Sequence, residues 1–289
     1  MPRIHALLSM ICKNNKIYAD YAFFKETQMQ SSNPAISVIR KNAGVYNFGG
    51  TEAGATISGT TTKSIVLVAL TLIIGYFAMN YTINSVYTTG QVPNGLMLGS
   101  VILGFIVALV TIFKPTAAPI TAPIYAVLEG GALGSLSGIF EIQYPGIVST
   151  AVMSTFVVVM TMLALWKFKI IVPTQRFRSI ITGAIGGICV LYVANMIFSL
   201  FGANLIPQTG PISIIVSLVV CTVAAFSLVL DFENIQVSVD EGLPKYFEYY
   251  NAFSLLVTIC WLYVEILKLL SKRDNESSPL RYKSTKREP

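Results

Sequence analysis

Seven apolar runs, separated by short polar connections, decide what this chain can fold into. Crossing the roughly 30 Å hydrocarbon core of a bilayer takes about 20 helical residues, and each run is close to that length. Helices are expected because every backbone N–H and C=O group in hydrocarbon must find its partner within the segment. The runs are Ser64–Tyr87, Leu96–Phe113, Ala117–Phe140, Gly146–Trp166, Ser179–Phe201, Ile212–Leu230 and Tyr250–Leu270. The sequence therefore predicts an all-α integral membrane protein with seven transmembrane helices.

Composition supports the same class of protein. Of the 289 residues, 54% are hydrophobic and only 12% are charged, whereas about a quarter of a soluble domain is charged. We divide the chain into a cytoplasmic amino-terminal region (1–63), a membrane domain (64–270) and a basic carboxyl tail (271–289). The first region shows no signal peptide. Met29 is an alternative start, in which case residues 1–28 would not belong to the protein.

Lysines and arginines indicate the orientation. Seven precede the first run, six lie in the connections after the second, fourth and sixth runs, and the alternate connections contain none. Because positive residues are enriched in cytoplasmic loops, the amino terminus is predicted to be cytoplasmic. The carboxyl tail carries six more and would lie outside if all seven runs cross. Either the tail is carried across despite its charge, or one run is re-entrant and both ends are cytoplasmic; seven crossings are favoured.

Small residues and prolines predict local packing. Glycines four residues apart let helix backbones approach closely in lipid, which favours a compact bundle. Pro115, Pro119 and Pro123 precede or begin the third run and predict a loop followed by a strained or kinked helix start. The glycine sets are Gly95/Gly99, Gly130/Gly134/Gly138 and Gly183/Gly187.

Enzyme chemistry lacks its usual residues. The only histidine is His5, which excludes Ser-His and Cys-His mechanisms and most zinc sites from the membrane domain. An intramembrane aspartyl protease needs two aspartates, and Asp231 alone lies close to a run. The cysteines within the runs are typical of small buried hydrophobes, and no phosphate-binding glycine motif follows a strand. We therefore predict no enzyme activity, no cofactor and no nucleic-acid partner.

Carboxylates within the runs are the candidate functional groups. Glu129 lies near the middle of the third run, where a charged side chain costs on the order of 3 kcal/mol. Desolvation favours its neutral acid, which either donates a structural hydrogen bond or carries a proton or cation. Glu265 follows Thr258 by two turns, among aromatic and aliphatic residues. Acids at segment ends or in connections are expected to be solvated: Glu141, Glu233, Asp240, Glu241 and Glu248.

Six blocks of the sequence resemble the Bax inhibitor-1/YccA family, in particular its bacterial branch with long amino-terminal regions. The resemblance implies a seven-helix fold with the last helix at the centre, in the bacterial inner membrane. For some members it implies a proton-sensitive calcium leak governed by paired acids on the last two helices, and for others regulation of a membrane protease or suppression of cell death. The blocks are "SSNPA" (31–35), "GFIVALVTIFKP" (104–115), "APIYAVLEGGALGSLSGIFEIQYPGIV" (122–148), "LVLDFENI" (228–235), "GLPKYFEYYNAF" (242–253) and "LLVTICWLYVEILKLL" (255–270).

The resemblance assigns one acid of the pair and leaves two choices for the other. Asp231 matches the family's acid at the end of the sixth helix, near the interface where it hydrates easily. Matching "YVEI" to the family's Tyr-x-Asp motif makes Glu265 the second acid, whereas aligning the end of the last helix places a neutral residue near Thr258 there. In antiparallel helices Asp231 and Glu265 would be roughly 20 Å apart at about 1.5 Å per residue. Lys114 either pairs with Asp231 as a latch or snorkels to the interface.

Two functions remain open. The first is a cation leak, for calcium, controlled by protonation of buried carboxylates, because hard cations prefer oxygen ligands. The second is a non-conducting regulator of a membrane protease or another membrane protein. The expected partners are the lipid bilayer, calcium ions and protons, and such a protease.

Overall fold

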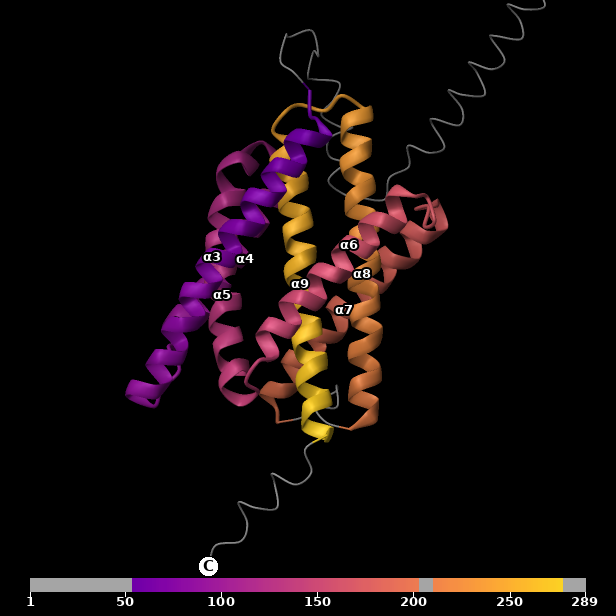
Figure 1. Ribbon diagram of the computed structural model, residues 1–289. Helices are drawn as coiled ribbons and strands as arrows, with labels where there is room; N and C mark the ends of the chain where they lie inside the picture. The colour runs from indigo at the N-terminus through magenta and orange to yellow at the C-terminus, as the bar shows by residue number, and fades with distance from the viewer. Residues whose placement is uncertain (1–53, 203–209, 278–289) are drawn as a thin grey trace, which may run out of the picture. The chain divides into compact units, whose positions relative to one another are not determined.

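The computed structural model describes residues 54–202 and 210–277 (Figure 1). In these ranges the chain forms α-helices and one 3-10 helix and has no strand, which confirms the all-α class. The helices are α3 (Ile57–Thr89), α4 (Asn94–Phe113), η1 (Pro115–Ala117), α5 (Ala118–Gln143), α6 (Ile147–Lys167), α7 (Gln175–Leu200), α8 (Pro211–Asp240) and α9 (Phe247–Ser277). Met29, the block at 31–35 and the tail beyond 277 lie outside the described residues.

Each of the seven predicted runs corresponds to one α-helix of the described residues. Six of these helices are long and apolar enough to cross a membrane: α3, α4, α6, α7, α8 and α9. The exception is α5, because glycines, serines and Glu129 dilute its apolar residues. The multi-span character is therefore confirmed, and the crossing of α5 stays a prediction.

Several helices extend beyond the apolar runs that predicted them. α3 begins at Ile57 instead of Ser64, and its amino end is capped by Thr56, whose Oγ1 accepts a hydrogen bond from the Gly59 N–H at 2.9 Å. α8 continues past Leu230 to Asp240. α9 likewise exceeds its run at both ends. Hydropathy marks only the apolar part of such helices, so the helical region is longer than the predicted 64–270.

The last helix lies among four others. α9 packs against α3, α5, α6 and α8, and it contributes to both apolar cores of the described chain. One core joins it to α3 and α5 through residues such as Leu67, Ala126 and Leu256. The other joins it to α6 and α8 through residues such as Ala151, Leu228 and Leu262. This arrangement agrees with the central last helix that the family resemblance implied.

One glycine set forms a close helix contact. A Cβ atom on Gly130 would lie 2.8 Å from the Thr71 carbonyl oxygen, and one on Gly138 would lie 3.0 Å from Thr82 Cβ. Between them, Gly134 faces the backbone of Gly75. The α3 and α5 backbones thus meet along three turns, as predicted; we call this contact the glycine seam.

The other two glycine sets do not pack as predicted. Nothing in the described chain lies within 4 Å of a Cβ built on Gly95, Gly99, Gly183 or Gly187. For Gly183 and Gly187 the reason is the position of α7, which packs mainly against α8 and is buried over only 6% of its most apolar part, against 50% for α9. Glycine spacing alone therefore does not identify which face meets a neighbour.

The prolines begin α5 without breaking it. Pro115 opens the 3-10 turn η1, Pro119 lies in the first turn of α5, and Pro123 lies inside the helix. A proline in the first turn is tolerated because the N–H it lacks would have no intrahelical acceptor there. The predicted loop is thus a short helical turn that leads directly into α5.

Candidate functional site

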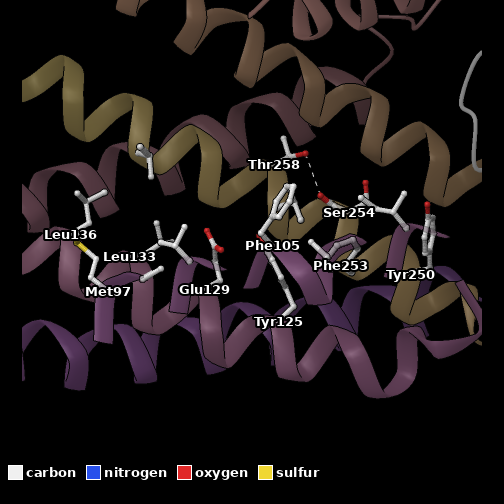
Figure 2. Close-up of a pocket in the computed structure, with 16 residues that line it drawn as sticks. Met97, Phe105, Tyr125, Glu129, Leu133, Leu136, Tyr250, Phe253, Ser254 and Thr258 are labelled. Atoms are coloured by element: carbon white, nitrogen blue, oxygen red, sulfur yellow. Dashed lines mark hydrogen bonds between the residues drawn. The ribbon is translucent and has the colours of Figure 1, made fainter. Parts of the chain in front are cut away.

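A cavity of about 690 Å³ lies between α4, α5 and α9 (Figure 2). Its walls are mostly aliphatic and aromatic, and Glu129 is the only charged residue among those that line it. Tyr125 lies one turn before Glu129 on α5, and its hydroxyl interacts with the Glu129 carboxyl. Ser254 and Thr258 contribute hydroxyl groups from α9. The cavity therefore offers one carboxylate and a few hydroxyls within an apolar wall.

The position of Glu129 follows from which helices pack against the other faces of α5. The glycine seam occupies the face toward α3, and Gly131 lies against α4, where its Cβ would meet Ser100 Oγ at 2.7 Å. Glu129 lies beside the seam and lines the cavity, where it is half-buried. The seam thus closes on α3 and leaves Glu129 on the cavity wall.

Asp231 lies behind the α9 wall of the same cavity. Its side chain is buried, with 7% of the residue exposed, and its Oδ1 accepts a hydrogen bond from Ser254 Oγ at 2.8 Å. Its Oδ2 is buried and has no hydrogen-bond partner among the described residues. The prediction that Asp231 lies at a helix end and hydrates easily is therefore wrong, because α8 continues to Asp240.

The residues opposite Asp231 on the last helix are neutral. Ser254 donates to it directly, and Thr258, one turn further on, lies close enough to interact with its carboxyl. Thr258 itself donates to the Ser254 carbonyl oxygen at 3.2 Å (Figure 2). Of the two alignments considered above, this geometry corresponds to the one that places a neutral residue near Thr258.

Glu265 belongs to a separate cluster between α7, α8 and α9. It is 1% exposed, and its Oε1 accepts hydrogen bonds from Tyr192 at 2.9 Å and from Trp261 at 3.2 Å. Lys268 forms an ion pair with the same oxygen at 2.7 Å. Its surroundings are therefore not only aromatic and aliphatic, as expected, but include a cation one turn away. No described contact joins Glu265 to Asp231.

A lysine near the carboxyl end of α9 also contacts the neighbouring helix. Lys272 Nζ donates to Ser217 Oγ at 2.7 Å and to the Ser213 carbonyl oxygen at 3.3 Å, both on α8. Lys268 Nζ lies 4.9 Å from the centre of the Tyr192 ring. The first basic residue of the predicted tail is therefore part of the bundle.

Lys114 does not form the proposed latch in this structure. It is exposed at the carboxyl end of α4, where it is the C-cap residue. Among the described residues no ion pair involves Lys114.

Glu248 is a buried acid whose structural role the sequence did not reveal. It was expected to be solvated, but it is 1% exposed. Its Oε1 accepts hydrogen bonds from the backbone N–H and the Oγ1 of Thr56, each at 2.9 Å, and its Oε2 forms an ion pair with Lys63. These partners lie 192 and 185 residues away in the chain, and no local motif signals a contact over such a separation.

Two acids within helices also contact the ends of neighbouring helices. Glu141 accepts hydrogen bonds from the N–H groups of Gly146 at 2.7 Å and Val148 at 3.1 Å, at the start of α6. Glu233 accepts one from Trp166 Nε1 at 3.1 Å and lies 3.8 Å from Arg178. Both were expected to be solvated, and both are half-buried, so they stay partly exposed while they contact a neighbouring helix.

The comparisons with known proteins identify a family. A family model described as Bax inhibitor 1 like matches residues 15–275. No curated protein and no solved structure matches the chain.

Proposed function

The chain belongs to the Bax inhibitor 1 like family, and from this premise we propose that it is a pH-sensitive calcium leak of a bacterial inner membrane. Glu129 and Asp231 are the carboxylates that carry the leak and its response to protons. Glu265, in its own cluster, stabilises the α7–α9 contact and is not one of the pair.

One observation carries the proposal: one carboxylate lines the cavity, and a second lies behind the α9 wall of that cavity. Glu129 lines it from α5, and Asp231 reaches its α9 wall through Ser254, which itself lines the cavity. Calcium prefers six to eight oxygen ligands, which carboxylates, hydroxyls, carbonyls and waters supply. Protonation of either carboxylate removes a negative charge and a ligand, so cation passage through this region depends on pH.

Calcium flux into liposomes tests the proposal. The purified chain is reconstituted around a calcium dye and assayed at two pH values. Wild type is expected to leak calcium at rates that differ between the two pH values. Asp231→Asn, which removes the charge and keeps the shape, is expected to leak at the same rate at both pH values. Asp240→Asn is the matched control, because Asp240 is exposed on the same helix. A folded Asp231→Asn protein with the wild-type flux and pH dependence excludes Asp231 from the mechanism.

The same assay distinguishes the alternative function. A folded wild-type protein that passes no calcium at either pH would favour a non-conducting regulator of a membrane protease or another membrane protein. Its helices and tails would then be the binding surfaces.

The proposed orientation is tested by cysteine labelling. The native cysteines are first replaced, and single cysteines are placed at Gln91, before α4, and at Val172, before α7; both positions are exposed. An impermeant reagent outside the cell is expected to label position 91, and a third single cysteine placed in the α7–α8 connection, and to miss position 172. Labelling of position 172 from outside would contradict a cytoplasmic amino terminus.

A further inference from the structure

The cavity between α4, α5 and α9 has the properties of a ligand site. Its volume of about 690 Å³ lies within the roughly 300–1,000 Å³ typical of small-molecule sites. Such sites combine apolar walls with a few placed polar groups, and this one has a single carboxylate in an apolar wall. We propose that the cavity binds a lipophilic organic ammonium ion, with Glu129 as its counter-ion.

The charge of the lining selects a cation. Glu129 is its only charged residue, and no lysine, arginine or histidine is among the residues that line the cavity. In the described part of the chain, no ion pair involves Glu129. The uncompensated negative charge of the carboxylate would therefore repel a bound anion. An ammonium group would instead be attracted to it and would act as its counter-ion.

The aromatic residues favour an organic cation. Phe105 from α4, Tyr125 from α5, and Tyr250 and Phe253 from α9 all line the cavity. The Tyr125 and Phe253 rings meet edge to face, with centroids 4.9 Å apart. Figure 2 shows Phe105 and Tyr125 beside Glu129, with Phe253 and Tyr250 further along the same side. Ring faces attract ammonium groups, and such aromatic cages are used for quaternary ammonium ligands.

The remaining wall sets the size and polarity of the ligand. Aliphatic residues of all three helices line the cavity, including Val101, Leu133, Leu136 and Val257. These side chains are placed to contact alkyl or aryl groups on nitrogen, which favours a substituted ammonium ion over ammonium itself. The ligand class is therefore an ammonium ion with apolar substituents.

Binding is tested on the full chain in detergent by isothermal titration calorimetry, after subtraction of titrations into protein-free micelles. The probes are benzyltrimethylammonium and its neutral isostere neopentylbenzene, which has carbon in place of nitrogen. Wild type is expected to bind the ammonium saturably and at least about tenfold more tightly than the isostere. Glu129→Gln is expected to weaken ammonium binding by about tenfold or more, and Glu241→Gln, which removes an exposed acid, to leave it unchanged.

The outcomes separate this site from the proposed leak, because binding is measured without flux. Absence of saturable ammonium binding to wild type overturns the site. Equal affinity for the two probes, or an unchanged affinity in folded Glu129→Gln, overturns the role of the carboxylate. If Glu129→Gln does not fold, the comparison of the two probes on wild type still shows whether the cavity prefers the ammonium ion. Phe105→Leu, at a residue that is 64% exposed, is then expected to weaken ammonium binding and not isostere binding.

Discussion

Lys63, near the start of α3, forms an ion pair with Glu248, near the start of α9. The two residues lie 185 positions apart in the chain. The same carboxylate accepts two hydrogen bonds from Thr56, the cap residue of α3. Lys63 also lies 4.7 Å from the centre of the Tyr249 ring. A single buried acid thus holds the first described helix against the last.

Glu248→Gln is expected to lower stability by about 2 kcal/mol. Breaking a buried ion pair costs about 3–5 kcal/mol when the remaining charge stays buried, and the loss is smaller here because Lys63 is 17% exposed and partly hydrated. Thermal unfolding in detergent measures the change, with Glu241→Gln as the exposed control. Equal unfolding midpoints for Glu248→Gln and wild type would show that the pair contributes nothing.

Alanine substitutions test the glycine seam. Gly134→Ala is expected to destabilise the protein by about 1–3 kcal/mol, because the new methyl group overlaps the Gly75 backbone and the helices must separate. Gly187→Ala is the control: nothing lies within 4 Å of its Cβ, and alanine is the better helix former by about 1 kcal/mol. Unfolding midpoints that fall equally in both variants would contradict the seam.

Ser254→Ala removes the only described donor to Asp231 Oδ1. Because Oδ2 has no hydrogen-bond partner among the described residues, the loss of the Ser254 hydrogen bond to Oδ1 leaves only the nearby Thr258 to interact with the carboxyl group, at an expected cost of about 1–2 kcal/mol. Ser149→Ala, at an exposed serine that donates to the Gly146 carbonyl, is the matched control in the same unfolding assay. A Ser254→Ala protein as stable as this control would show that the contact is energetically neutral.

Tyr192→Phe is expected to loosen α7. The hydroxyl donates to Glu265 at 2.9 Å and accepts from Lys268 at 3.2 Å, and α7 otherwise packs mainly against α8. Hydrogen exchange followed by mass spectrometry should show faster exchange in α7 peptides and unchanged exchange in α3. Tyr81→Phe, at an exposed tyrosine of α3, should change neither. Unaltered α7 exchange in Tyr192→Phe would contradict a tethering role.

Two substitutions of Glu129 distinguish a role in folding from a role in calcium flux. Glu129→Gln keeps the shape and hydrogen-bond capacity of the neutral acid, so we expect a folded protein with reduced calcium flux. Glu129→Lys is expected to impair folding, because it places a cation in an apolar wall without an acidic partner. Thermal stability and liposome flux are measured on the same preparations. Unfolding of Glu129→Gln would indicate a structural role, and normal flux would remove Glu129 from the mechanism.

Hydropathy predicted which residues form helices but not where the helices end. It correctly located the seven runs, because apolar segments of that length have one stable form in lipid. It missed the beginning of α3 and the last third of α8, where polar residues stay helical through partners on other elements. Asn251, for example, donates to Ser238 of α8 at 2.9 Å. Such contacts form only after the chain has folded and leave no local pattern.

The candidate site was predicted in part for the same reason. Glu129 and Asp231 stand out because a carboxylate among apolar residues is visible in the sequence. Glu248 does not, because it lies among polar and aromatic residues and its partners precede it by most of the chain. Glu265 was noticed, but not its partners, since Tyr192 lies on another helix.

The glycine seam also limits how the cavity can change its width. Along the glycine seam, backbone atoms and the side chains of Ile74, Ala78 and Thr82 make the close contacts. Alanine has no side-chain rotamers, and β-branched side chains in a helix have few, so little rearrangement is available that would let one helix slide along the other. The two helices are therefore expected to move as one rigid unit, which includes the cavity wall that carries Glu129. Widening of the cavity then requires displacement of α9 or α4 relative to α3 and α5.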